Sequence, residues 1–157
     1  MAAHDDATTL DRFVVVPASY VYLLREGASG TEVLLQQRGD VPYMASHWAA
    51  GAAGHVERGE DAFAAARREL REELDVSADL HFEFTMQRTL HAEAIDERVD
   101  FFFTARSWEG EPRIVEGSKC AGLGWFPLDA LPAPMVPHEA HALAHLGSGL
   151  GYLTFGF

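Results

Sequence analysis

The sequence predicts an α+β fold in which a mixed β-sheet lies between helices as an α/β/α sandwich. Strand-like runs rich in β-branched and aromatic residues occur on both sides of one strong helical segment, and the first two runs are joined as a hairpin. A chain of 157 residues has the length of one compact domain with a substantial core. We therefore expect a flexible N-terminal arm over residues 1–12 and a single domain over residues 13–157.

The first expected strand covers residues 13–24, FVVVPASYVYLL, where Pro17 predicts a bulge or a break. A Gly-containing loop separates it from VLLQQR, residues 33–38, and two such runs predict a β-hairpin. Residues 39–59 show little periodicity and are rich in Gly, Ala and aromatic residues. Because loops of this length in compact domains are often functional, we expect functional residues in this one.

The strongest helix signal covers residues 60–74, which are rich in Ala, Arg, Glu and Leu and contain no Gly or Pro. Phe63, Ala66, Leu70 and Leu74 recur at helical spacing and predict one buried stripe.

The second half of the chain alternates strand-like and loop-like stretches and ends in a Gly-rich segment for which we predict no regular element. The expected elements are strands at 80–91, at 98–106 and ending at Pro127, a loop at 107–121, one helical turn at 129–132 and a helix at 137–147.

The chain is strongly acidic, with 24 Asp and Glu against 12 Lys and Arg and a formal net charge of -12. The negative electrostatic potential of such a chain repels phosphate, which argues against nucleic acid polymers and anionic membrane surfaces as partners. An anionic small substrate would therefore need a cation to mediate its binding. The single cysteine, Cys120, and the acidic start of the chain argue against secretion. We expect a cytoplasmic protein with no membrane span.

Glu69, Glu72 and Glu73 place three carboxylates on one side of the expected helix, because residues three and four apart share a face. Like charges at this spacing destabilise an isolated helix. Mg²⁺ binds carboxylate oxygens, waters and substrate phosphates, so it would relieve the repulsion and also mediate binding of an anionic substrate. The alternative is a solvent-exposed acidic face paired with arginines of the same helix.

The segment GHVERGEDAFAAARRELREELDV, residues 54–76, resembles the signature of the Nudix hydrolases. That signature is Gly, five residues, Glu, seven residues, then Arg-Glu-aliphatic-any-Glu-Glu-any-Gly-aliphatic. Eight of its nine specified positions match, namely Gly54, Glu60, Arg68, Glu69, Leu70, Glu72, Glu73 and Val76. The ninth position holds Asp75 instead of Gly, and Asp tolerates the left-handed conformation expected after a helix end.

The resemblance implies the Nudix fold and a Mg²⁺-dependent hydrolase, with Mn²⁺ as an alternative ion, in which water attacks phosphorus in a nucleoside diphosphate derivative. One of the signature glutamates would accept the proton of that water, and Arg68 would orient a neighbouring carboxylate such as Glu60. The implied catalytic residues are Glu60, Arg68, Glu72 and Glu73. The implied metal ligands are the Ala53 carbonyl, Glu69, Glu72, Glu73 and Glu116, with Glu111 as the alternative to Glu116.

The loop WEGEPRIVEG, residues 108–117, looks like that of MutT-type family members and favours a nucleoside triphosphate or a related nucleotide as the small-molecule substrate. The family's markers for ADP-ribose and diadenosine polyphosphates, a Pro and a Tyr beyond the signature, are replaced by Ala92 and Ala94. An ADP-ribose or nucleotide-sugar pyrophosphatase and a non-catalytic ligand sensor remain alternatives. A prenyl diphosphate isomerase would need catalytic Cys and Glu positions outside the signature, and the only Cys comes after it. For the assembly, a homodimer is left open as an alternative to a monomer.

Other side chains leave two interpretations open. Aromatic and guanidinium groups near the long loop suit either contact with a nucleobase or packing within the domain. These groups are Arg38, Tyr43 and Trp48. The histidines at 138, 141 and 145 share a helix face but lack zinc-protease spacing, so we favour a role without metal. The run Phe101–Phe103 predicts a strand between two hydrophobic layers.

Overall fold

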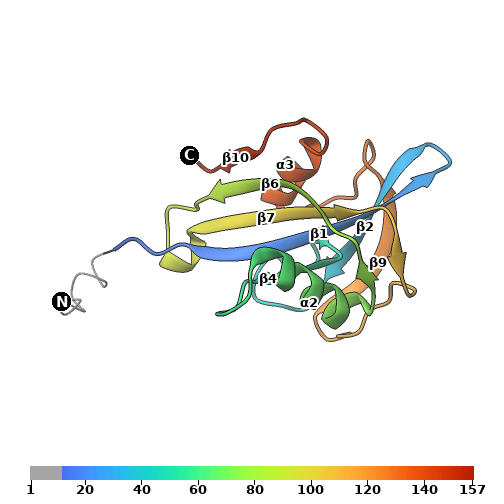
Figure 1. The fold of residues 1–157 in the computed structure, drawn as a ribbon, viewed down its shortest axis with the longest axis horizontal. Coiled ribbons are helices and arrows are strands. Elements are labelled where there is room, and N and C mark those ends of the chain that lie inside the picture. The colour runs from blue at the N-terminus through green and yellow to red at the C-terminus, as the bar shows by residue number, and fades with distance from the viewer. Residues whose placement is uncertain (1–11) are drawn as a thin grey trace.

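The computed structural model describes residues 12–157, so the expected arm over residues 1–12 lies outside the described residues except for its last residue. A mixed eight-stranded sheet forms the centre of the fold. Helices α2 (Ala62–Leu74) and α3 (Pro137–Ala144) cover its opposite faces, as Figure 1 shows with α2 in green and α3 in red. The predicted α+β sandwich is confirmed.

The strand order in the sheet is β10-β6-β7-β1-β2-β3, with β4 paired to β1 and β9 paired to β2. The pairs β1–β7 and β10–β6 are parallel, whereas the other pairs are antiparallel. The strands of this sheet are β1 Val16–Gly27, β2 Gly30–Arg38, β3 Trp48–Ala50, β4 Ala52–His55, β6 His81–Arg88, β7 Arg98–Ala105, β9 Cys120–Pro127 and β10 Tyr152–Phe155. The remaining elements are a small ladder of β5 Ser77–Ala78 with β8 Trp108–Glu109, and the short 3-10 helix η1 Ala94–Asp96.

Alternating side chains of the central strands build a core on each face of the sheet. In β1, Tyr22 packs in the layer under α3 and its neighbour Val21 packs in the layer under α2. Phe102 and Phe103 of β7 divide in the same way, which confirms the expected strand between two hydrophobic layers. Since both faces are covered, these strands are apolar along most of their length rather than alternating with polar residues.

Helix α2 follows the predicted pattern closely. The side chain of Asp61 caps its first turn by accepting a backbone N–H at 2.8 Å. Ala66, Leu70 and Leu74 of the predicted stripe are buried, and Phe63 lies at its edge with 36% exposure.

Asp75 ends helix α2 in the left-handed conformation, with φ 56° and ψ 39°. Its backbone N–H donates to the Arg71 carbonyl at 3.2 Å and the Val76 N–H donates to the Leu70 carbonyl at 3.5 Å, so the last turn is closed in the manner usual for a Gly at this place. The substitution of the signature Gly therefore keeps the backbone geometry that was expected.

Two predictions about the first half of the chain were wrong. Pro17 is the second residue of β1 and causes no bulge, because its missing N–H falls at the beginning of the strand, where its register with Val99 is regular. The expected loop over residues 39–59 contains β3 and β4, which pair with β2 and β1. Those short strands consist mainly of Ala and Gly, which carry little local strand signal.

Two predictions about the second half were also wrong. Residues 129–132 form no helical turn; a turn at residues 127–130 is closed by the Ala130 N–H, which donates to the Pro127 carbonyl at 3.0 Å, and residues 131–132 have no regular structure. The Gly-rich end, for which no element was predicted, forms β10 as a parallel partner of β6. Within residues 12–157, no helix has the length and apolar character needed to cross a membrane.

Candidate active site

Strand β4 and helix α2 bring the predicted site residues together. Gly54 in β4 lies directly against Glu69 in α2, and a Cβ atom at Gly54 would come closer than 3.0 Å to the Glu69 carboxylate. The absence of a side chain at this position therefore creates the space in which Glu69 lies.

Arg68 is the centre of the hydrogen-bond network in this site. Its guanidinium donates to both oxygens of Glu60, at 2.7 and 3.1 Å, to Glu69 at 2.7 Å and to Glu72 at 3.2 Å. It also donates to the His55 carbonyl at 3.0 Å, which ties α2 to the end of β4. Arg68 thus orients three carboxylates that would otherwise repel one another, including Glu60 as expected.

The carboxyl groups around Arg68 differ in pKa and in solvent exposure. Hydrogen bonds from Arg68 lower the pKa of Glu60, whereas burial raises the pKa of Glu69. The Glu69 side chain is 12% exposed and that of Glu72 is 52% exposed. Glu72 is therefore the acid of the three on α2 that faces solvent most openly.

Glu73 points toward the sheet and is mostly buried. Its Oε2 accepts a hydrogen bond of 2.7 Å from the Ala53 amide, so the predicted ligand residue Ala53 lies next to it. Burial, together with the nearby carboxylates of Glu69 and Glu116, raises the pKa of Glu73 to about 8. The same features would favour a bound cation at this point, since a cation offsets repulsion among buried carboxylates.

Glu116 lies near Glu73, and the two line one small cavity beside Gln36. The Glu116 carboxylate is half exposed and pairs with Lys119 at 3.2 Å. Glu111 lines a different cavity, next to Trp125. The geometry therefore favours Glu116 over Glu111 as the loop acid of the site.

The donor set fits a hard divalent cation, although its members do not converge on one point. Among residues 12–157, no three acidic, His or Cys side chains form a group spaced to hold a metal ion. Instead, Arg68 supplies the positive charge between Glu60, Glu69 and Glu72. The carboxylate oxygens of Glu69, Glu72 and Glu73 are nevertheless the type of donor that Mg²⁺ and Mn²⁺ prefer.

A cavity of about 330 Å³ opens beside the carboxylates. Its wall includes Gly54 and Glu73, so a ligand in the cavity would lie next to the acids of α2. Three arginines, Arg38, Arg88 and Arg98, also line it. The cavity therefore offers cationic donors within a protein whose net charge is -12.

A buried polar network next to this cavity was missed by the sequence analysis. Arg88 Nε donates to Asp100 Oδ2 at 2.5 Å, and Arg88 Nη2 donates to the Tyr20 hydroxyl at 3.3 Å. Asp100 has no exposed surface, and its Oδ1 has no hydrogen-bond partner among the described residues. The only sign of this network in the sequence is one Arg and one Asp within otherwise apolar strands. Polar residues of this kind are also common at the edges of strands, so the pattern does not distinguish a buried ion pair.

Glu139, near the start of α3, was also missed. It is 3% exposed, and its Oε1 accepts hydrogen bonds of 2.7 Å from the Tyr22 hydroxyl and from the Ala50 amide. Burial raises the pKa of Glu139 to about 7. A Glu in the first turn of a helix is normally exposed and is stabilised there by the helix dipole, so the sequence gives no sign of this burial.

The residues with two open interpretations divide between cavity and core. Arg38 and Tyr43 line the cavity, where Arg38 Nε donates to the Tyr43 carbonyl at 2.9 Å. Trp48 packs edge-on against Phe126, with ring centroids 4.8 Å apart. Trp48 therefore has a packing role, whereas Arg38 and Tyr43 are placed to contact a ligand.

The three histidines near α3 do not share a site. His138 is buried, and its Nε2 lies 3.2 Å from the Tyr20 hydroxyl. His141 and His145 pack against each other with ring centroids 4.6 Å apart. These contacts account for the histidines within the fold.

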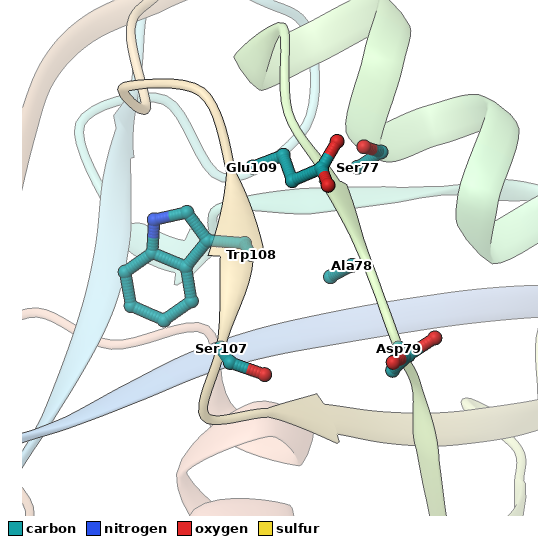
Figure 2. A pocket seen from close by; sticks show the side chains of 6 residues that line it. All are labelled: Ser77, Ala78, Asp79, Ser107, Trp108 and Glu109. Carbon is teal, nitrogen blue, oxygen red and sulfur yellow. The ribbon is translucent and has the colours of Figure 1, made fainter.

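A second open cavity, of about 370 Å³, lies between β5 and β8 and contains none of the predicted site residues. Figure 2 shows Trp108 and Glu109 of β8 beside the β5 residues Ser77 and Ala78. Asp79 and Glu109 are the acids in its wall, and no arginine or histidine lines it. This cavity has no counterpart to the acid and arginine groups around α2.

Comparison with known proteins agrees with the signature and the fold. A model of the NUDIX domain matches residues 15–146. A MutT NUDIX hydrolase from Burkholderia pseudomallei is 28% identical, with a TM-score of 0.72 over 83% of this chain and 97% of that one. A mutator MutT protein from Bacillus halodurans is 22% identical, with a TM-score of 0.65 over 91% and 90%. The NUDIX domain of Shewanella oneidensis NrtR, solved with ADP ribose, is 19% identical, with a TM-score of 0.60 over 80% and 84%.

The match to the family model covers most of the chain, and the signature residues within it lie together between β4, α2 and the cavity. The chain therefore belongs to the Nudix family, and it is a hydrolase that acts on phosphoric anhydride bonds of nucleoside diphosphate derivatives.

Proposed function

We propose that the protein is a Mg²⁺-dependent hydrolase that cleaves a diphosphate linkage in a nucleoside triphosphate or a related nucleotide by attack of water at phosphorus. The observation that carries this proposal is the position of Glu73 in the wall of an arginine-lined cavity, next to Glu69. Acids suited to a cation thus adjoin guanidinium groups suited to phosphate oxygens.

We assign the metal ligands to Glu69, Glu72, Glu73, Glu116 and the Ala53 carbonyl. Mg²⁺, or Mn²⁺ in its place, would supply charge neutralisation on the phosphate oxygens and a lower pKa for the attacking water. Because Gly54 leaves room for Glu69 and the Ala53 amide holds Glu73, strand β4 fixes the carboxylates of α2 before substrate binds.

Glu60 and Arg68 act together in positioning. Glu60 accepts hydrogen bonds from Arg68 on both oxygens and from the Glu57 amide at 2.8 Å. These bonds lower the pKa of Glu60, which makes it a poor proton acceptor near neutral pH. We therefore assign Glu60 to holding Arg68, and we assign acceptance of the water proton to an acid of α2, among which Glu72 is the most exposed.

The decisive experiment is a panel of nucleoside triphosphates, ADP-ribose and nucleotide sugars with Mg²⁺ or Mn²⁺, in which phosphate or pyrophosphate release is measured. We expect turnover of a nucleoside triphosphate or a close relative, and we expect Glu73→Gln to abolish it while the protein stays folded. The matched control is Glu26→Gln, which changes an exposed carboxylate at the far end of β1. Unchanged turnover in Glu73→Gln would refute the assignment of the site.

The same panel separates the alternatives. Preferential turnover of ADP-ribose or a nucleotide sugar would replace the nucleoside triphosphate assignment and keep the chemistry. Binding of Mg²⁺ without turnover of any member would favour a ligand-sensing domain. The cytoplasmic location and the homodimer stay predictions, for cell fractionation and for light scattering respectively.

A further inference from the structure

Two arginines on neighbouring strands line the 330 Å³ cavity. Arg88 of β6 and Arg98 of β7 are direct cross-strand partners in the antiparallel ladder, and both line the cavity. Directly opposed like charges destabilise a sheet, so this arrangement calls for an anion nearby.

The described residues supply one carboxylate for these two guanidinium groups. Asp100 pairs with Arg88, whose side chain is buried. Arg98 donates from Nε to the Ile95 carbonyl at 2.6 Å, and its Nη1 lies 2.9 Å from His55 Nε2. Within residues 12–157, no carboxylate lies within ion-pair distance of Arg98. One positive charge is therefore left over beside the cavity.

The other acids of the cavity wall are engaged elsewhere. Glu73 is held by the Ala53 amide, and Glu139 is held by Tyr22 and the Ala50 amide. These contacts place both carboxylates beside β3 and the middle of β4, whereas Arg98 contacts the last residue of β4. The excess charge is thus spatially separate from the acids that we assign to the metal.

We propose that Arg88, Arg98 and His55 form a subsite for a phosphate group of the substrate that is additional to the diphosphate cleaved at α2. The inference rests on the proposed function in one respect, namely that the substrate's diphosphate is cleaved at α2. Guanidinium forks match phosphate oxygens in bidentate geometry. A neutral nucleobase edge could accept hydrogen bonds there but would leave the extra charge uncompensated.

His55 connects this subsite to the candidate catalytic residues. Its ring faces Arg98, while its backbone carbonyl accepts from Arg68 at 3.0 Å. Two residues of extended strand, about 7 Å, separate Ala53 beside Glu73 from His55 beside Arg98. A single nucleotide can therefore reach both places, with its diphosphate at α2 and a second phosphate, such as one on a ribose hydroxyl, between the arginines.

The test compares two substrates that differ by one phosphate on a ribose hydroxyl. We expect the wild-type protein to prefer the phosphorylated member by about tenfold or more in kcat/KM, as one charged hydrogen-bonded contact provides. In Arg98→Gln this ratio should fall to near one, and in Arg98→Lys it should take an intermediate value. Arg106→Gln, an exposed arginine paired with Glu26, is the matched control and should keep the wild-type ratio. Equal use of the two substrates by the wild-type protein would overturn the proposal.

A binding measurement without turnover distinguishes failure of this subsite from failure of the proposed function. Inorganic phosphate is titrated by calorimetry in the presence of a chelator, with the melting temperature of each variant as the check on folding. We expect binding to wild-type protein and to Arg106→Gln, and about tenfold weaker binding to Arg98→Gln. No binding to the wild-type protein, or equal binding to Arg98→Gln, would refute the subsite whatever the enzyme hydrolyses.

Discussion

Replacing Gly54 with Ala tests whether the backbone of β4 sets the position of Glu69. The new Cβ would come closer than 3.0 Å to the Glu69 carboxylate, a distance that real Cβ atoms do not adopt. Gly54 has an ordinary backbone conformation that Ala can adopt, and the obstructing atoms are the end of a flexible side chain. We therefore expect Glu69 to move while the fold is retained.

The size of the effect follows from the displacement. To move its nearer oxygen from 2.1 Å to ordinary van der Waals contact at 3.4 Å, the Glu69 carboxylate must shift by at least about 1.3 Å, and a misplacement of only about 1 Å in a catalytic group costs about 100-fold in rate. This corresponds to about 2.7 kcal/mol in the activation free energy. The same movement lengthens the contact between Glu69 and Arg68, now 2.7 Å, so part of the loss comes from disorder in Arg68.

The assay is kcat/KM on the best substrate of the nucleotide panel, together with thermal unfolding. The control is Gly151→Ala, since nothing lies within 4 Å of a Cβ at that position and its backbone conformation is ordinary. We expect the control to keep full activity and both variants to melt within a few degrees of the wild-type protein. Wild-type activity in Gly54→Ala would show that β4 does not set the position of Glu69.

Two further predictions concern buried charges. Asp100→Asn should destabilise the protein by about 3–5 kcal/mol in urea unfolding, because it leaves the buried Arg88 charge unpaired; a loss below about 1 kcal/mol would contradict this. Burial raises the pKa of Glu139 to about 7, so the stability that its protonated form contributes is present at low pH and is lost as pH rises from about 4.5 to about 7. Glu139→Gln should therefore be more stable than wild type at pH 8, by at most about 3 kcal/mol, and equal to it near pH 4.5; parallel stability curves would refute the shift.

The elements that the sequence predicts correctly are those whose signal is local. Helix α2 has both helical spacing of apolar residues and an Asp at its cap, and these depend only on neighbours in the chain. The hairpin of β1 and β2 likewise needs only two strand-like runs and a short turn. Even Asp75 could be assigned its left-handed conformation, since the helix had to end there.

The elements that were missed are held by partners far away in the sequence. Strand β10 exists because residues 152–155 lie parallel to β6, and a Gly-rich segment gives no local sign of this pairing. Strand β4 consists of AAGH and is fixed by β1 on one side and by α2 on the other. Small residues are needed there for close approach to Glu69, and the same residues hide the strand from propensity arguments.

The site shows the same division. The signature locates Glu60, Arg68 and the acids of α2, because their spacing along one helix and its preceding loop is fixed by the chain itself. The spacing does not reveal that Arg68 bridges three carboxylates, nor that Glu73 turns inward to the Ala53 amide. Those contacts depend on where β4 lies, and β4 was not predicted.

The position of the cations, more than the net charge, decides which anions this protein can bind. Electrostatic fields between exposed groups are screened over about 8 Å at physiological ionic strength, so distant surface acids weigh little inside the cavity. There the nearest charges are Arg38, Arg88 and Arg98 together with Glu73 and Glu139. A nucleic acid polymer extends over many screening lengths and meets the acidic surface, whereas one nucleotide meets mainly the cavity. The net charge of -12 therefore argues against binding of the polymer, whereas binding of a small phosphate ester is determined by the arginines of the cavity.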